Sequence, residues 1–116
     1  RDHAMEWTVR LGDGTEESQR RMQRGLDRMW PYTYELFESD ETANRLVAQG
    51  VAVDVGDLRP EWESYVFAVI DEATLTRPEE SNWRPSGGRN GLHTEAMGFI
   101  LTEMQNLHRT HPGVAW

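Results

Sequence analysis

The spacing of apolar residues most constrains the fold of this chain, because it is helical in almost every segment that has a pattern. The clearest case follows Asp57, where one face of a helix collects Leu58, Trp62, Tyr65, Val66, Val69, Ile70 and Ala73. Another covers residues 92–110, with the stripe His93, Met97, Ile100, Leu101, Met104 and Leu107. Only residues 51–56 alternate as a strand does, and the chain offers no second strand to pair with them. We therefore predict an all-α fold with a loop at 51–56.

Turn and cap residues divide the rest of the chain into further helices. Residues 1–11 have the pattern of the last turns of a helix, and Gly12 suits the left-handed position that ends one. A second helix is expected from about 16 to 30, capped either by Asp13 in a capping box or by Thr15. Pro31 breaks or kinks the pattern, and residues 32–38 can continue helically with Pro31 in the first turn. Ser39-Asp40 then caps a short helix that Gly50 closes. The prediction is three main helices (16–30, 57–73 and 92–110) plus shorter ones.

Charge and cysteine content narrow the classes of function. The 116 residues carry 20 Asp and Glu against 12 Lys and Arg, a net charge of −8 that disfavours binding to nucleic acid or to an anionic membrane surface. The chain has no cysteine, which removes disulfides, thiolate metal sites and thiol catalysis. No apolar run is long enough to span a bilayer. We predict a cytoplasmic protein.

An acidic helical chain raises the question of a carboxylate-bridged di-iron site. Such sites combine Glu from two helices with Glu-x-x-His from two others, because residues three apart share a helical face. No Glu in this chain has His three positions later, and Gly98 stands where Glu95 would need it. His108 and His111 have the spacing of a weak metal site, but a helix C-terminus explains them more simply. We therefore assign no catalytic, cofactor-binding or metal-binding residue to this chain.

The tryptophan content points to protein contacts. The apolar fraction is only 37%, yet the chain has five Trp. Tryptophan is enriched at the energetic centres of interfaces. We select four as candidates for contacts with another chain or with a missing part of this one, while expecting some of them to belong to the core: Trp30, Trp62, Trp83 and Trp116.

Several stretches together carry a resemblance to a known family. They are residues 7–18, which include Leu-Gly-Asp-Gly-Thr-Glu-Glu-Ser, then 21–23, 30–33, 71–75, 93–105 and 111–116, which end in Pro-Gly-Val-Ala-Trp. In these the chain resembles the structural C subunits of the bacterial ring-1,2-phenylacetyl-CoA epoxidases of phenylacetate degradation. The resemblance implies a ferritin-like helical bundle, of which residues 1–116 would be the C-terminal portion of one domain. Because the first residue is Arg and already helical in pattern, we expect a longer parent chain.

The resemblance also implies a role in a multicomponent monooxygenase. This chain would be a non-catalytic subunit that pairs with a homologous catalytic subunit. The di-iron centre, FAD, iron–sulfur cluster and NADPH would belong to other subunits, and the complex would epoxidise the aromatic ring with O₂. A fragment with so lean a core should expose an apolar patch, and a homodimer would cover it. Two alternatives stay open: a fragment of a di-iron subunit that binds its own metal, and an acidic helical adaptor.

Overall fold

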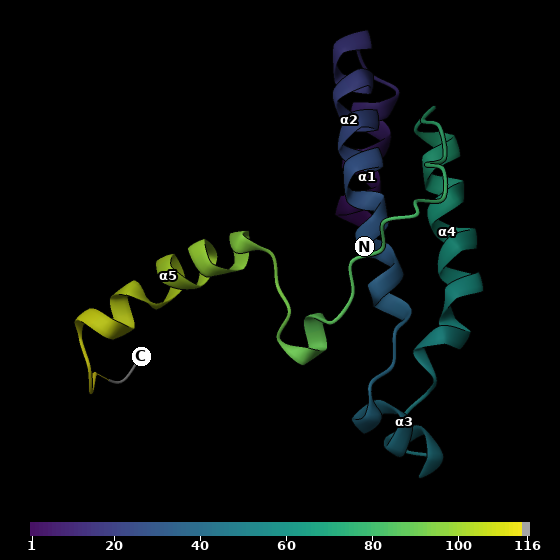
Figure 1. Ribbon diagram of the computed structural model, residues 1–116. Coiled ribbons are helices and arrows are strands. Elements are labelled where there is room, and N and C mark those ends of the chain that lie inside the picture. The colour runs from purple at the N-terminus through teal and green to yellow at the C-terminus, as the bar shows by residue number, and fades with distance from the viewer. Residues whose placement is uncertain (115–116) are drawn as a thin grey trace. The chain divides into compact units, whose positions relative to one another are not determined.

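The computed structural model describes residues 1–114, and every regular element within that range is helical. Figure 1 shows the elements in chain order. They are α1 (Asp2–Gly12), α2 (Glu16–Met29), the 3₁₀ helix η1 (Trp30–Phe37), α3 (Glu41–Ala48), η2 (Val55–Leu58), α4 (Arg59–Glu72), η3 (Gly88–Asn90) and α5 (Glu95–Thr110). The all-α prediction is confirmed, and the model is consistent with a ferritin-like helical bundle. None of the helices in residues 1–114 is long and apolar enough to cross a membrane.

The chain forms two compact units, which we describe separately. Unit 1 is Arg1–Ser86 and contains the elements from α1 to α4, and unit 2 is Gly87–Trp116 and contains η3 and α5. That both belong to one ferritin-like domain stays a prediction.

Local cap residues set several boundaries in unit 1. Thr15 caps α2, since its hydroxyl accepts a hydrogen bond from the Ser18 amide at 3.2 Å, which decides between the two predicted caps. Asp40 caps α3 in the same way through the Ala43 amide at 2.7 Å. The helix predicted to begin at Asp57 begins at Arg59, and η2 before it covers the end of the predicted loop and the first two residues of the predicted helix. Local sequence thus predicts the helices well and their first residues less well.

Gly12 has a different role from the one predicted. It is not left-handed but is the last residue of α1, and Asp13 ends the helix with φ −92° and ψ 25°. Gly12 is buried against the end of α4, where a Cβ would lie 2.3 Å from the Ala73 carbonyl oxygen. The glycine is therefore required by the close approach of α1 to Ala73 and not by backbone conformation.

A small aromatic and aliphatic core holds unit 1 together. Its buried members are Trp30, Tyr34, Ile70, Ala73 and Leu75, and partly buried neighbours are Val9, Met22, Leu26, Trp62, Val66 and Phe67. These side chains come from α1, α2, η1, α4 and the segment after α4. Pro31 lies in the first turn of η1, as predicted, and the 3₁₀ turn brings Trp30 and Tyr34 to the same side.

Thr74 fixes the exit from α4 in a strained conformation. Its φ of 56° is left-handed, which is unusual for a β-branched residue. The Gln19 side-chain amide donates to the Thr74 carbonyl at 3.1 Å and to its hydroxyl at 2.8 Å. The hydroxyl also donates to the Gly12 carbonyl at 3.3 Å. These contacts from α1 and α2 offset the strain and direct the chain back along α2.

Unit 2 consists of a short turn followed by α5. Gly87 and Gly91 flank η3 with positive φ, and Leu92 donates its amide hydrogen bond to the Gly87 carbonyl at 3.0 Å. That turn delays the helix, so α5 begins at Glu95 and not near the predicted residue 92. It ends at Thr110 as predicted.

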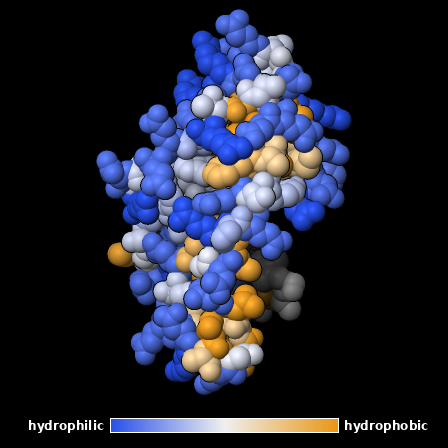
Figure 2. All heavy atoms as spheres, turned by 90° about the vertical axis from the view of Figure 1, so that its right-hand side faces the viewer, coloured by the Kyte–Doolittle hydropathy of each residue, from blue (hydrophilic) through white to orange (hydrophobic). Residues whose placement is uncertain are grey.

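One group of exposed apolar residues lies at the lower end of the face shown in Figure 2, which is where Figure 1 places α3 and the segment after it; other apolar atoms lie in the upper part of the same face. In that segment Val51 is 72% exposed and Val53 is 67% exposed.

Candidate functional site

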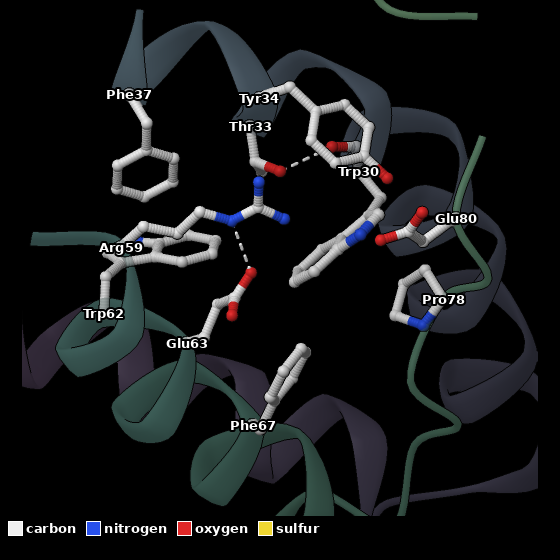
Figure 3. Close-up of a pocket in the computed structure, with 10 residues that line it drawn as sticks. All are labelled: Trp30, Thr33, Tyr34, Phe37, Arg59, Trp62, Glu63, Phe67, Pro78 and Glu80. Carbon is white, nitrogen blue, oxygen red and sulfur yellow. Dashed lines mark hydrogen bonds and ion pairs between the residues drawn. The ribbon is translucent and has the colours of Figure 1, made fainter. Parts of the chain in front are cut away.

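One small hollow of unit 1 is lined mostly by aromatic rings, and we call it the aromatic cavity (Figure 3). Its volume is about 70 Å³, and its lining is Trp30, Thr33, Tyr34, Phe37, Arg59, Trp62, Glu63, Phe67, Pro78 and Glu80. Trp30 is the central ring, with its centroid 5.7 Å from those of both Trp62 and Phe67. Phe37 meets Trp62 edge to face at 5.3 Å. The cavity is thus walled by η1 and α4 and formed by interlocking rings.

An ion pair from α4 lies inside this aromatic wall. Arg59 Nε donates to Glu63 Oε1 at 2.7 Å, one helical turn later, and both side chains are about one-third exposed. The Arg59 guanidinium also lies over the rings of Tyr34 and Phe37, at 5.7 and 6.0 Å from their centroids. The hydrogen bond to Glu63 raises the pKa of Arg59 above its ordinary value. This arginine therefore stays charged while its guanidinium lies over aromatic rings.

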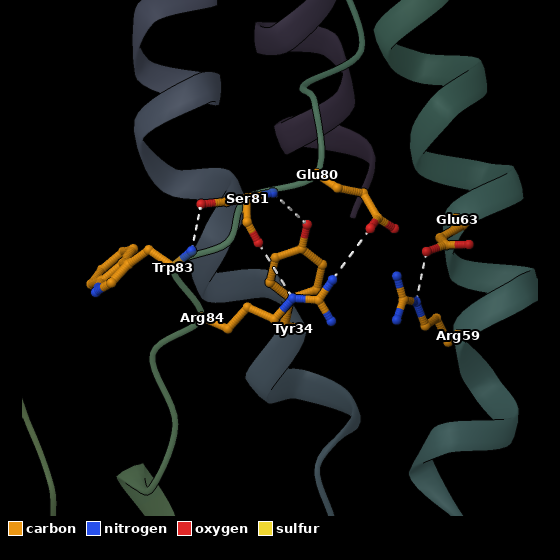
Figure 4. Close-up of polar contacts among 7 residues, drawn as sticks. All are labelled: Tyr34, Arg59, Glu63, Glu80, Ser81, Trp83 and Arg84. Atoms are coloured by element: carbon orange, nitrogen blue, oxygen red, sulfur yellow. Dashed lines mark hydrogen bonds and ion pairs between the residues drawn. The ribbon is translucent and has the colours of Figure 1, made fainter.

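The 77–84 segment closes the cavity from the other side, with Tyr34 as its attachment point (Figure 4). The Ser81 amide donates to the Tyr34 hydroxyl oxygen at 3.4 Å, and the Arg84 guanidinium lies over the Tyr34 ring at 4.3 Å. Arg84 also pairs with Glu80 at 3.3 Å. The guanidinium groups of Arg59 and Arg84 thus both form cation–π contacts with the buried Tyr34 ring.

The chain leading into this segment is fastened to α2 and α4. The Gln23 side-chain amide accepts from the Thr76 amide at 2.8 Å and donates to the Thr76 carbonyl at 3.0 Å, as a neighbouring strand would. Arg77 forms a bidentate ion pair with Asp71 and lies over Phe67 at 4.7 Å. The hydrogen bond from Arg77 lowers the pKa of Asp71 below its ordinary value of 3.8. The 77–84 segment is therefore anchored before it reaches Tyr34.

The size and charge of the cavity do not fit a substrate site. Pockets for small molecules usually measure about 300–1,000 Å³, whereas this cavity measures about 70 Å³. Each charged group that lines it already has an opposite partner: Arg59 with Glu63, and Glu80 with Arg84. The arrangement can hold the 77–84 segment in place.

Trp83 of the 77–84 segment forms an aromatic pair with Tyr32 of η1. Trp83 is 55% exposed and meets Tyr32 edge to face, with ring centroids 5.3 Å apart. Its amide donates to the Ser81 hydroxyl oxygen at 3.1 Å, and Arg84 Nε donates to the Ser81 carbonyl at 3.4 Å. An exposed tryptophan with its backbone already ordered loses little conformational freedom when a partner binds. This Trp83–Tyr32 pair is the candidate functional site of unit 1.

A second hollow is wider and more apolar. It lies between α1, α2 and α4, measures about 240 Å³, and is lined by Arg1, Ala4, Met5, Thr8, Met22, Leu26, Tyr65, Val66, Val69 and Ile70. The Tyr65 hydroxyl donates to the Met5 sulfur at 3.6 Å, and Arg1 lies over the Tyr65 ring at 4.8 Å. This hollow is a groove on the helices and contains no charged cluster.

The tryptophans selected from sequence differ in how far they are buried. Trp30 is 7% exposed and Trp62 packs against it, so both have a place inside the fold. Trp83 is exposed, and Trp116 lies outside the described residues. The structure brings the first two together in the aromatic cavity and leaves Trp83 on the surface. The interface prediction itself stays a prediction.

The carboxylates and imidazoles are spread over the described residues. No group of three or more His, Asp or Glu side chains in residues 1–114 could hold a metal ion. Glu95 and Glu103 are exposed on α5, and so are His108 and the nearby His111.

Sequence reasoning missed the groups that hold the site together. The Arg59–Glu63 pair had a local signal, because the two residues are four apart on a predicted helix. The contacts of Arg84 and Ser81 with Tyr34 had no local sequence signal. These two residues are about fifty positions from Tyr34 in the chain and belong to an irregular segment.

Comparisons with known proteins identify the family of this chain. The family model described as "Phenylacetic acid catabolic protein" matches residues 1–116. The chain is also 48% identical, over 110 residues, to a protein of Escherichia coli (strain K12) that is named as the C subunit of 1,2-phenylacetyl-CoA epoxidase. The match covers 95% of this chain and 44% of that relative, so the chain spans less than half of the relative's length. The chain belongs to the phenylacetic acid catabolic protein family.

Proposed function

We propose that this chain is part of a non-catalytic, structural subunit of a phenylacetyl-CoA ring epoxidase in aerobic phenylacetate degradation. The observation that carries the proposal is the 48% identity, over nearly the whole chain, to a protein named as the C subunit of such an enzyme. The subunit pairs with a homologous catalytic subunit and supports it in an active geometry. Residues 1–116 form the C-terminal portion of its ferritin-like domain, and the complex works in the cytoplasm.

The donor set of the described residues supports a structural role over a metal-binding one. A di-iron centre needs several carboxylates and imidazoles converging on one point. In residues 1–114 no three such side chains converge, and Glu-x-x-His does not occur in the sequence. We therefore assign the di-iron centre, FAD, iron–sulfur cluster and NADPH to other subunits and derive no chemical step through them.

The Trp83–Tyr32 pair is the surface that we assign to the catalytic subunit. Large aromatic side chains that are exposed but ordered are typical interface anchors. Trp83 meets both conditions, because it is 55% exposed and its segment is held by Ser81, Arg84 and Tyr34.

The test measures binding between the full-length protein and the catalytic subunit, by size-exclusion chromatography and calorimetry. We expect a stable complex, and we expect Trp83→Ala to weaken it by about 2 kcal/mol or more, roughly thirtyfold. Trp7→Ala is the matched control, because Trp7 is 60% exposed and has no role in the proposed contact.

Three outcomes separate the parts of the proposal. Failure of the full-length protein to bind the catalytic subunit overturns the structural role. Equal binding by wild type and Trp83→Ala overturns the placement of the contact and leaves the role standing. Near-stoichiometric iron on the full-length protein alone, lost when Glu95 or Glu103 is changed, would establish a subunit with its own metal.

A further inference from the structure

Two glutamines of α2 hold the backbone of the segment that follows α4. Gln19 donates to the carbonyl and hydroxyl oxygens of Thr74, and Gln23 is hydrogen-bonded to both backbone groups of Thr76. The glutamines are one helical turn apart, a rise of about 6 Å, and residues two apart in an extended chain span about 6.6 Å. Alternate residues of the segment therefore match successive turns of α2.

The side-chain amide of Gln23 uses all of its polar groups. Its nitrogen donates to Asp27 Oδ1 at 2.8 Å and to the Thr76 carbonyl at 3.0 Å, and its oxygen accepts from the Thr76 amide at 2.8 Å. The reversed amide would place its oxygen against that carbonyl and that carboxylate, so only one orientation fits. Gln23 therefore binds the N–H and C=O of a single residue, as the hydrogen-bonded pair of an antiparallel ladder does.

A shift of the segment by two residues would lose these contacts. We use register to mean which residue of the segment lies opposite Gln23. If Pro78 took the place of Thr76, the Gln23 oxygen would lose its donor, because proline has no amide hydrogen. If Thr74 took that place, it would leave Gln19, which donates to both of its oxygens. Neither shift preserves the hydrogen bonds of both glutamines.

A shift by one residue is opposed by the core. Side chains alternate between the two faces of an extended chain, so such a shift turns each of them to the opposite face. Leu75 is 7% exposed and belongs to the core, and it would be turned into solvent. Arg77 would at the same time leave Asp71 and Phe67. Gln23 and Leu75 thus favour the same register from opposite sides of the segment.

The register at Thr76 decides which residues reach η1. Only four residues separate Thr76 from Ser81, whose amide donates to the Tyr34 hydroxyl oxygen at 3.4 Å. Trp83, two residues later, meets the Tyr32 ring. The connection is short and includes a proline with a fixed φ, so it has little slack. A displacement at Thr76 would therefore bring other residues to both tyrosines.

From these contacts we propose that Gln23 is a positioning residue: its amide selects Thr76 and thereby sets the register in which Trp83 lies beside Tyr32. The inference rests on the proposed function only in so far as Trp83 contacts the catalytic subunit. The register itself is a property of the free protein and can be measured without a partner.

The first test is hydrogen exchange of backbone amides in the free full-length protein. Gln23→Met removes the polar contacts and keeps the length of the side chain. The amides of Thr76 and Ser81 should exchange roughly tenfold faster or more, because both lose their place in one register. Arg24→Met is the matched control on the same helix, since the Arg24 side chain makes no hydrogen bond or ion pair within the described residues. It should change these rates by less than about threefold.

The second test is a double-mutant cycle on binding to the catalytic subunit. Gln23→Met should weaken binding by roughly fivefold or more in the wild-type background, because Trp83 is no longer held in the binding position. In the Trp83→Ala background the same change should weaken binding by less than about twofold. A purely structural effect of Gln23 would weaken binding equally in both backgrounds.

The outcomes separate the register from the interface. Unchanged exchange at Thr76, or faster exchange at Thr76 without any change at Ser81, overturns the inference. Equal acceleration in the middle of α4, at Ile70, means that Gln23 stabilises the whole unit and overturns it too. Equal weakening of binding in both Trp83 backgrounds overturns the positioning role. A wild-type protein that does not bind the catalytic subunit overturns the proposed function, and the exchange experiment then decides the register on its own.

Discussion

The contact between Gly12 and Ala73 offers the sharpest test of how unit 1 is packed. A Cβ on Gly12 would lie 2.3 Å from the Ala73 carbonyl oxygen, 2.8 Å from its Cβ and 3.1 Å from Leu75 Cγ. The first two distances are shorter than any real Cβ contact, and one of the atoms is backbone. Gly12→Ala therefore forces α1 away from the end of α4 and disturbs Leu75, a member of the core.

The size of the effect follows from two opposing contributions. Overpacking a tight site costs about 1–3 kcal/mol. Replacing a helical glycine by alanine returns up to about 1 kcal/mol, and less at the last residue of a helix, where Gly12 lies. The net change in the free energy of unfolding should be a loss of roughly 1–2 kcal/mol. With a urea m-value near 2 kcal/mol/M, the midpoint falls by about 0.5–1 M.

Gly25→Ala in α2 is the matched control. No atom lies within 4 Å of a Cβ placed on Gly25, so only the gain in helix propensity remains and the variant should be more stable by up to about 1 kcal/mol. Urea unfolding followed by circular dichroism measures both variants. If Gly12→Ala is as stable as Gly25→Ala, α1 does not approach Ala73 as closely as described and the reasoning fails.

Three further predictions concern single side chains. The lowered pKa of Asp71 means that its pairing with Arg77 adds stability that is present above about pH 4 and is lost as the pH falls through the folded-state pKa. Asp71→Asn should thus be less stable than wild type at pH 7, and the difference should shrink as the pH falls below 3.8; a difference that does not shrink in acid would contradict this origin. Trp30→Ala should lose about 3–5 kcal/mol in urea unfolding, because Trp30 is the centre of the core; a loss below about 1 kcal/mol would show that the ring is not buried. Thr15→Ala should lose about 1 kcal/mol by removing the cap of α2, and Thr15→Ser should restore it.

Local chemistry predicted most of the helices but not the contacts between them. The α2 cap, the proline in η1 and the stripe of α4 are determined by residues a few positions apart, so their signals are visible in sequence. The role of Gly12 was predicted wrongly, because the atoms that require a glycine belong to Ala73 and Leu75, about sixty positions away. A glycine at the end of a helical pattern looks the same in sequence whether it adopts a left-handed conformation or allows a close contact with a distant residue.

The site shows the same division between local and distant causes. Composition pointed to tryptophans as contact residues but did not show which of them are buried. Trp30 is 7% exposed, whereas Trp83 is 55% exposed. The difference is set by η1, whose 3₁₀ turn directs Trp30 inward, and by an irregular segment that carries Trp83 outward over Tyr32. Neither conformation has a periodic pattern from which it could have been predicted.

The aromatic cavity and the Trp83–Tyr32 pair are connected through the 77–84 segment, which lines the cavity on its inner side and carries Trp83 on its outer side. Tyr34 is buried, and on it converge a guanidinium from α4 and a guanidinium from the 77–84 segment, each balanced by a glutamate. Because cation–π contacts and paired charges hold the segment at a buried ring, the residue just before Arg84 is held with it. That residue is Trp83. The interior of unit 1 therefore orders the surface side chain that the proposed partner would bind.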